Sequence, residues 1–267
     1  MSSHVAAHFS READYWDAVY RDAQDDVSAS IYQERLARML AWVDRLDLPP
    51  GSRALDLGTG AGHAAVALAL RGWHVEAIDV SEAMAALAQA NADRAGVGAR
   101  VRCAPGDAQA LALADASLDL VVGLGVLPWV PSATTVMRDV ARVLRPGACA
   151  IVSTANRARL TYRLDPLRNQ DLRAVKRPLR ALLERRGLWR AQAAEPTLLS
   201  LRETDQLLAD NGFERLAWAC FGFGPFTFLG RPILSRRTDV QLNRRLQRVA
   251  ALRRLGSEYL VLARRRG

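Results

Sequence analysis

Two carboxylates and three alternating glycines lie within one short stretch of the chain. Gly58, Gly60 and Gly62 follow Asp56 in the pattern D-x-G-x-G-x-G, and Asp79 ends the stretch. Glycine permits a tight turn with positive φ and lets a ligand approach the backbone where a Cβ would collide. A carboxylate at the tip of a strand can accept hydrogen bonds from both hydroxyls of a ribose. These residue types therefore predict a site for a nucleoside-containing ligand.

The flanking segments must bring these groups together. The apolar segments that end at Asp56 and Asp79 are typical of strands, and HAAVALAL between them is typical of a helix. This is a βαβ unit, in which ligands bind at the carboxyl ends of the strands. The free N–H groups at the start of the helix point toward the same place.

The glycine spacing separates two classes of cofactor. A dinucleotide fingerprint, G-x-G-x-x-G, would require glycine at position 63, where the chain has His63. The pattern that is present resembles the first motif of the class I S-adenosylmethionine-dependent methyltransferases. A βα turn whose glycines occur by chance is the alternative.

Later segments extend the resemblance over residues 52–156. RVRCAPGDAQAL provides an acid after a third strand, SLDLVVGLG provides a fourth strand, and RVLRPG resembles the helix–turn–strand of the "type 11" subgroup. The YWDAVY, GVLPW and GFGPFTFLGRP segments also resemble bacterial members of that subgroup. This wider likeness carries no substrate with it.

The resemblance implies an α/β fold with a Rossmann-like, seven-stranded, mostly parallel sheet and helices on both faces. EYLVLARR would be the antiparallel seventh strand. We expect a single domain over residues 1–267, which has four parts. They are an N-terminal helical lid (1–48), a cofactor-binding core (49–156), a helical acceptor-cap insert after the fifth strand (157–200), and the rest of the sheet with a C-terminal helix (201–267).

The implied cofactor is S-adenosyl-L-methionine. By resemblance, Asp79 would hold the ribose, while Asp107 and the backbone N–H of Ala108 would hold the adenine. The expected cofactor-binding residues are Asp56, Gly58, Thr59, Gly60, Gly62, Asp79, Val80, Asp107, Ala108, Leu124 and Tyr20.

Aromatic and basic residues are candidates for binding the methyl acceptor. They are Tyr15, Trp16, Trp129, Arg157, Phe223 and Phe226. For the aromatic residues, packing within the fold is the alternative. The phenylalanine-rich run near residue 223 suits an apolar acceptor pocket, a membrane-facing loop or a buried hinge.

The net charge of +9 is unevenly distributed. Residues 1–156 carry 13 basic and 18 acidic side chains, whereas residues 157–267 carry 24 and 10. For the Arg-rich segment 157–196, three interpretations stay open: a solvated helical face, a cap that grips an anionic acceptor, or a surface that meets anionic lipid or nucleic acid. No RNA-binding module is recognisable, so nucleic acid is disfavoured as a partner.

Methyl transfer from a sulfonium requires the acceptor to be held in line and water to be excluded. A less reactive acceptor also needs a general base. His8 and His63 are weak candidates for that base, and capping or packing is the alternative for His63. No metal-ligand spacing and no catalytic triad is recognisable, and the three cysteines indicate buried or half-buried thiols.

The sequence thus predicts methyl transfer to a nitrogen or oxygen atom of a small organic acceptor, anionic or aromatic, mainly by positioning. RNA or lipid methylation, or S-adenosylmethionine binding without catalysis, are the alternatives, and peripheral membrane contact stays open. Apolar runs are shorter than the ~20 residues of a membrane span. The N-terminus has no signal-peptide pattern, so we expect a cytoplasmic protein. The oligomeric state is not predicted.

Overall fold

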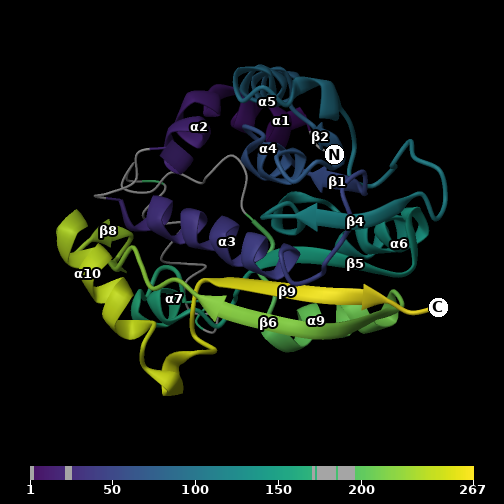
Figure 1. The fold of residues 1–267 in the computed structure, drawn as a ribbon. Coiled ribbons are helices and arrows are strands. Elements are labelled where there is room, and N and C mark those ends of the chain that lie inside the picture. Colours follow the sequence, from purple (N-terminus) through teal and green to yellow (C-terminus); the bar gives the residue numbers. More distant parts are fainter. Residues whose placement is uncertain (1–2, 22–25, 170–171, 173–184, 186–195) are drawn as a thin grey trace.

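A computed structural model describes residues 3–21, 26–169, 172, 185 and 196–267 of the chain. Its centre is a seven-stranded sheet with the strand order β3-β2-β1-β4-β5-β9-β6 (Figure 1). The strands of this sheet are β1 (Arg53–Leu57), β2 (His74–Asp79), β3 (Val101–Pro105), β4 (Leu118–Gly123), β5 (Leu144–Ala155), β6 (Phe213–Phe221) and β9 (Glu258–Arg265). The helices are α1 (Ser3–Arg11), α2 (Ala13–Arg21), α3 (Val27–Val43), α4 (His63–Ala69), α5 (Glu82–Arg94), α6 (Ala133–Val143), α7 (Leu160–Leu164), α9 (Leu201–Asp210) and α10 (Arg236–Leu246).

The sheet is parallel except at β9. Strand β1 pairs in parallel with β2 and β4, β2 with β3, and β4 with β5. Strand β9 covers the EYLVLARR segment and runs antiparallel to both β5 and β6. The predicted Rossmann-like, mostly parallel sheet with an antiparallel seventh strand is therefore confirmed.

Helices cover both faces of the sheet, which is why the central strands are apolar on both sides. On one face Ala54 and Leu120 pack with residues of α3, α4 and α5. On the other face Leu55 and Val121 pack with residues of α6 and α9. Ala54 and Leu55 are adjacent, and successive side chains of a strand point to opposite faces. The glycine turn therefore begins at the end of a strand that is buried on both faces.

The N-terminal segment, for which a helical lid over residues 1–48 was expected, forms the three helices α1 to α3. The side chain of Asp26 accepts hydrogen bonds from the N–H groups of Ser28 (2.7 Å) and Ala29 (3.4 Å), so α3 begins there as a separate helix. On α1, Ser10 Oγ lies 2.8 Å from Ser81 Oγ at the start of α5. Helices α1 and α2 therefore lie beside α5, whereas α3 runs alongside β9 (Figure 1).

The predicted acceptor-cap insert over 157–200 lies largely outside the described residues, which omit 170–171, 173–184 and 186–195. Its first described element is α7, and Asn156 forms a parallel bridge with Leu199 at the other end. In the parts of the chain that the structure describes, no helix is both long enough and apolar enough to span a membrane.

The segment after β6 forms a small hairpin, β7 (Thr227–Phe228) and β8 (Arg231–Pro232), followed by α10. Helix α10 begins after Ser235, whose side chain accepts a hydrogen bond from Thr238 N, and it ends at Leu246. The amphipathic pattern of the sequence continues beyond Leu246, but Val249 is exposed there. Helix α10 and the hairpin lie together at one side of the molecule (Figure 1).

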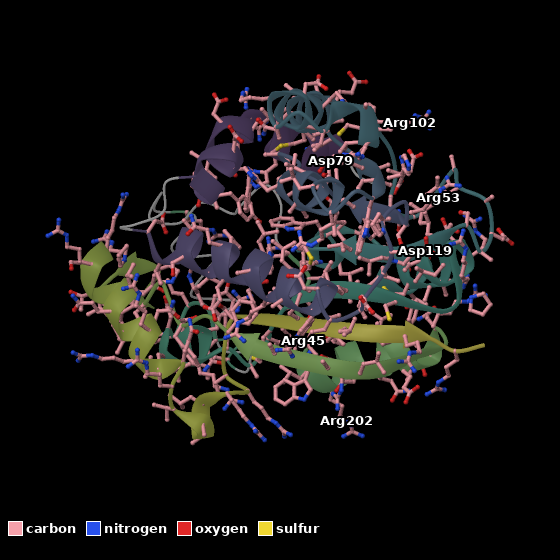
Figure 2. The ribbon with its side chains drawn as sticks, in the orientation of Figure 1. Arg45, Arg53, Asp79, Arg102, Asp119 and Arg202 are labelled. Atoms are coloured by element: carbon pink, nitrogen blue, oxygen red, sulfur yellow. The ribbon has the colours of Figure 1, made fainter. Side chains whose placement is uncertain are left out.

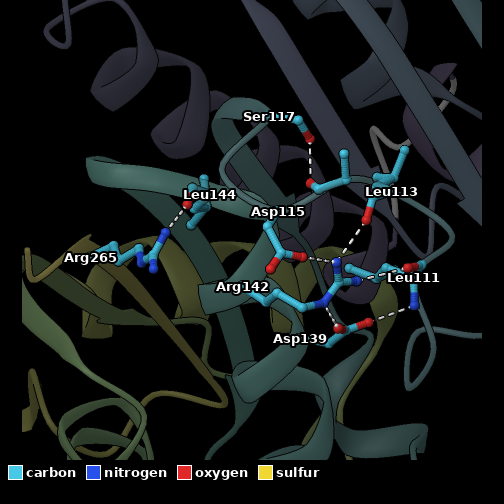
Figure 3. A network of polar contacts seen from close by, with 9 residues as sticks. Leu111, Leu113, Asp115, Ser117, Asp139, Arg142, Leu144 and Arg265 are labelled. Carbon is cyan, nitrogen blue, oxygen red and sulfur yellow. Dashed lines mark hydrogen bonds and ion pairs between the residues drawn. The ribbon is translucent and has the colours of Figure 1, made fainter.

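A network around Arg142 of α6 fixes the loop between β3 and β4 (Figure 3). The Arg142 guanidinium donates to the carbonyl oxygens of Leu111 (2.8 Å) and Leu113 (2.7 Å) and to the carboxylates of Asp115 (2.7 Å) and Asp139 (2.6 Å). Asp139 also accepts from Leu111 N at 2.5 Å. The hydrogen bonds that Arg142 donates to Asp139 and Asp115 raise its pKa. This network positions the loop that carries Asp107 and Ala108.

Candidate functional site

The glycine turn between β1 and α4 has positive φ at all three glycines: +67° at Gly58, +55° at Gly60 and +82° at Gly62. A Cβ at Gly58 would lie 3.0 Å from the Val126 side chain, and one at Gly62 would lie 2.8 Å from the Cβ of Ala88. A Cβ at Gly60 would meet no protein atom within 4 Å. Packing therefore requires glycine at two positions, while Gly60 faces open space.

The carboxylate of Asp79 closes against this turn. Its Oδ2 accepts a hydrogen bond from Gly60 N (2.9 Å), and its Oδ1 accepts one from Ser81 N (2.9 Å). Asp79 is only 8% exposed, and Figure 2 places it inside the molecule beneath the N-terminal helices. Burial raises its pKa, while the hydrogen bonds from Ser81 and Gly60 counteract this. The acid is thus held at the turn and is not turned toward bulk solvent.

Asp56, at the end of β1, is also buried. Its Oδ2 accepts hydrogen bonds from Thr59 Oγ1 (2.6 Å) and Ala65 N (3.1 Å). Burial raises the pKa of Asp56 to about 6, although these two hydrogen bonds favour the charged form. Asp56 therefore links the end of β1 to Thr59 in the glycine turn and to Ala65 in the first turn of α4.

A cavity of about 320 Å³ opens above the turn. Small-molecule sites typically have volumes of roughly 300–1,000 Å³, so this cavity suits a ligand of nucleoside size. Its lower wall comes from the sheet and includes Asp56, Gly58, Thr59, Gly60, Asp79, Val80, Ala108 and Leu124. Its opposite wall comes from the N-terminal helices and α7 and includes Phe9, Trp16, Tyr20, Tyr32, Arg35, Arg159 and Tyr162.

A buried ion pair lies in the cavity wall. Arg35 Nη1 of α3 lies 3.2 Å from Glu258 Oε2 at the start of β9, and Arg35 Nη2 donates to Tyr20 Oη at 3.2 Å. The guanidinium also lies 4.8 Å from the centre of the Tyr32 ring. Burial raises the pKa of the Tyr32 hydroxyl. Arg35 Nε has no hydrogen-bond partner among the described residues.

Sequence reasoning missed Arg35, Tyr32 and Glu258. One signal was present: Arg35 occurs midway between Ile31 and Met39 at four-residue spacing, and both are buried on the core side of α3. A charged side chain in that register is buried, and a buried charge needs a partner. The partner is 223 residues away and could not be read from the local pattern.

Lid helix α2 is joined to the core through Asp17. Asp17 Oδ1 accepts a hydrogen bond from Asn91 Nδ2 of α5 (2.9 Å) and lies 3.3 Å from His63 Nε2 at the start of α4. His63 lines the cavity, and its ring centre is 4.7 Å from that of Tyr20. The pair therefore places a carboxylate behind a histidine that lines the cavity.

Most of the predicted site residues line this cavity. The residues that do so are Asp56, Gly58, Thr59, Gly60, Asp79, Val80, Ala108, Leu124, Tyr20, Trp16, Trp129 and His63. Asp107 is not a lining residue, although its neighbours Gly106 and Ala108 are, and its Oδ1 accepts from Gln109 N at 2.9 Å. Gly62 lies behind the wall against Ala88.

The other predicted residues lie elsewhere for identifiable reasons. Arg157 pairs with Glu203 of α9 at 2.9 Å, and Tyr15 is 44% exposed. Phe223 and Phe226 are buried near α10, where their N–H groups donate to Asn243 (2.7 Å) and Asp239 (3.3 Å). Those two thus occupy the buried-hinge position that the sequence left open.

Two further predictions concern histidine and cysteine. His8 is not a lining residue, although its ring centre is 5.8 Å from that of Trp129.

The cysteines are free thiols: Cys149 is buried, while Cys103 and Cys220 are half-buried. Burial raises the pKa of Cys103 to about 12. The cysteines are therefore the buried or half-buried thiols that the sequence indicated.

Comparisons with known proteins agree with this architecture. The family described as "Methyltransferase domain" matches residues 55–152. The ubiquinone biosynthesis O-methyltransferase of Pseudomonas putida (strain GB-1) is 35% identical over 123 residues, which are 46% of this chain and 53% of that protein. The chain thus spans about half the length of the curated relatives it matches.

Among solved structures, magnesium protoporphyrin IX methyltransferase (ChlM) from Synechocystis PCC 6803 with bound SAH aligns with a TM-score of 0.64. It is 20% identical, and the alignment covers 98% of each chain. The [4+2]-cyclase SpnF aligns with a TM-score of 0.63 at 17% identity, covering 99% of this chain and 96% of that one. At these identities the likeness concerns the fold. The chain therefore shares its fold with these solved structures, and its residues 55–152 match the family described as "Methyltransferase domain".

Proposed function

We propose that the protein is an enzyme that binds S-adenosylmethionine in the cavity and transfers its methyl group to a small organic acceptor. The main support for this proposal is the hydrogen bond that the Gly60 N–H donates to the Asp79 carboxylate. Because of it, the glycine turn and the acid that would bind the ribose lie together at one wall of the cavity. When bound, S-adenosylmethionine supplies an activated methyl group on a sulfonium.

The residues present fit such a cofactor. Asp56, Asp79 and Glu258 give the cavity wall carboxylates, and six aromatic side chains line the same space: Phe9, Trp16, Tyr20, Tyr32, Trp129 and Tyr162. Carboxylates and aromatic faces both attract a cation. Gly60 lines the cavity without a Cβ that would occupy it. Asp79 would hold the ribose hydroxyls, and the backbone at Ala108 would lie beside the adenine.

An oxygen-centred acceptor is favoured over a nitrogen-centred one. The curated relatives are named O-methyltransferases, and the match includes the cofactor half of the site. Tyr162, Trp129 and Phe9 line the cavity, and they would contact an aromatic or apolar acceptor. Arg159, which stacks on Tyr162 with 4.1 Å between the guanidinium carbon and the ring centre, adds a positive charge to that wall.

For a hydroxyl acceptor, His63 would be the general base. It lines the cavity, and Asp17 lies 3.3 Å from its Nε2 and would stabilise the imidazolium that forms when the histidine takes a proton. The lid residues would contribute by positioning the acceptor and excluding water. Catalysis would therefore come mainly from positioning of the acceptor, and His63 would contribute to it as the base.

Isothermal titration of the purified protein with S-adenosylmethionine and S-adenosylhomocysteine tests cofactor binding. Release of S-adenosylhomocysteine in the presence of candidate phenols and carboxylic acids tests turnover. Binding without turnover on any acceptor would favour a protein that binds the cofactor without methyl transfer. That second function has one observation in its favour: a protein of the same fold is a [4+2]-cyclase by name.

A further inference from the structure

Four large apolar side chains are exposed on and beside the β7–β8 hairpin. Leu164 is 54% exposed, Phe228 and Leu229 are each 51% exposed, and Ile233 is 59% exposed. We call these four residues the hairpin patch. None of them lines the cavity. Apolar residues that gather at one place on a surface mark a site of interaction.

The hairpin presents its apolar residues outward. Thr227 pairs with Pro232, and Phe228 pairs with Arg231. Because successive side chains of a strand alternate, Phe228 and Arg231 project from the face opposite to Thr227. Leu229 occupies the turn with φ of +50°. The hairpin therefore exposes a convex tip with phenylalanine, leucine and arginine side by side.

A buried carboxylate anchors the hairpin to α7. Asp165 Oδ2 accepts hydrogen bonds from Thr227 Oγ1 (2.5 Å) and Gly230 N (3.0 Å), and Asp165 is fully buried. Leu164 directly precedes Asp165 in the chain, so Leu164 lies next to the hairpin. The patch is thus a fixed surface, assembled from two segments that are more than sixty residues apart.

The surface around the patch is positively charged. The sequence from 227 to 238, TFLGRPILSRRT, contains three arginines and no acid. Arg163 and Arg168 belong to α7 and the turn after it. Among the residues that the structure describes, Asp165 and Asp239 next to the hairpin are buried, and they accept hydrogen bonds from Gly230 N and Phe226 N. Solvent therefore meets apolar groups and guanidinium groups here.

We propose that the hairpin patch docks the protein on an anionic phospholipid surface. A convex apolar tip can enter the boundary between headgroups and acyl chains, while surrounding arginines contact the lipid phosphates. Two copies of the chain would bring their arginines face to face, which disfavours self-association through this patch. A nucleic acid would leave Leu164, Leu229 and Ile233 without apolar contacts. The inference does not depend on the proposed function.

Docking would also orient the cavity. Arg159 and Tyr162 line the cavity from α7 and the residue before it, and Leu164 of the same helix belongs to the patch. Helix α7 therefore connects the cavity wall to the docking surface. A lipid surface on the patch would lie beside the part of the cavity wall that Arg159 and Tyr162 form.

Sedimentation of the full chain with vesicles of equimolar phosphatidylcholine and phosphatidylglycerol tests the proposal. We expect binding that weakens as salt rises, and little binding to phosphatidylcholine alone. Leu229→Asn should weaken vesicle binding about tenfold, because a leucine leaves the apolar boundary. Asparagine tolerates the positive φ at this position, so the fold should be retained. Leu70→Asn, at a 64% exposed leucine after α4, is the matched control and should change binding less than about twofold.

A second pair of variants tests the charge. Arg231→Ala in the hairpin should weaken vesicle binding about fivefold. Arg102→Ala, at an exposed arginine on the side of the molecule away from α10, should not (Figures 1 and 2). Equal effects of the hairpin variants and their controls, or equal binding to both kinds of vesicle, would overturn the proposal. So would loss of a dimer or of RNA binding in Leu229→Asn with vesicle binding unchanged.

Discussion

The backbone N–H of Gly60 donates a 2.9 Å hydrogen bond to Oδ2 of Asp79, which joins the glycine turn to the tip of β2. A second hydrogen bond, from Thr59 N to the carbonyl oxygen of Ile78 (2.9 Å), holds the same two segments. The acid is therefore positioned by backbone groups before any ligand binds. Four predictions follow from this site and its surroundings.

Replacing Asp79 by asparagine should lower the affinity for S-adenosylhomocysteine by on the order of tenfold to a hundredfold, because charge-assisted hydrogen bonds to the ribose would be lost. Isothermal titration measures this. Asp119→Asn is the matched control, since Asp119 is on the same sheet but near the opposite ends of the strands (Figure 2). Unchanged affinity in Asp79→Asn would remove the ribose role from this residue.

Gly62→Ala should destabilise the fold by roughly 2–4 kcal/mol, since alanine would combine an unfavourable positive φ with an overlap against Ala88 of α5. Urea unfolding gives the free energy of unfolding. Gly96→Ala is the control, because Gly96 has a φ of +74° but no atom within 4 Å of its added Cβ. Gly96→Ala should cost only about 1 kcal/mol. Equal losses in the two variants would show that the α4–α5 contact is not tight.

The stability of the protein should depend on pH through Asp56. Its pKa rises from 3.8 to about 6 on folding because of burial. The folded state therefore binds a proton more tightly than the unfolded state does, and this contribution to stability is present below about pH 4 and lost as pH rises through 6. Relative to Asp56→Asn, the wild-type protein should gain roughly 3 kcal/mol between pH 7 and pH 4. Urea unfolding of both proteins at a series of pH values would show it, and parallel curves would contradict it.

Glu258→Gln should destabilise the protein by about 3–5 kcal/mol, because it leaves the buried Arg35 guanidinium without a counter-charge. Arg35→Met combined with Glu258→Leu removes both charges and should recover most of that loss. Thermal unfolding of the wild-type protein, of Glu258→Gln and of the double variant forms the test. A double variant as unstable as Glu258→Gln alone would show that packing around the pair, rather than the unpaired charge, determines the cost.

The βαβ unit and the glycine turn could be predicted because their signals are local: strand β1, the turn and Asp79 lie within one short stretch. The whole sheet, with its antiparallel strand at Glu258–Arg265, was expected from the resemblance to a known family. Contacts between distant segments could not be predicted. The Arg35–Glu258 pair joins α3 to β9, and the anchoring of the hairpin by Asp165 joins segments 62 residues apart.

The placement of the phenylalanines illustrates a second limit. From composition alone, the phenylalanines of residues 221–228 could line a pocket or form a buried hinge. Asn243 and Asp239 decide it, because their side chains bind the backbone N–H groups of Phe223 and Phe226. Phe228, two residues further on, is exposed at the hairpin instead. Phe223 and Phe226 are therefore buried near α10, whereas Phe228 of the same aromatic run is exposed.

The cavity draws its walls from two sources, and only one of them lies within the matched span 55–152. Tyr20, Tyr32, Arg35 and Tyr162 come from segments before and after it. Substitutions in those segments would therefore change one wall of the cavity and leave the glycine turn and Asp79 unchanged. Exchanging those segments for the corresponding segments of relatives would show which wall determines what the cavity binds.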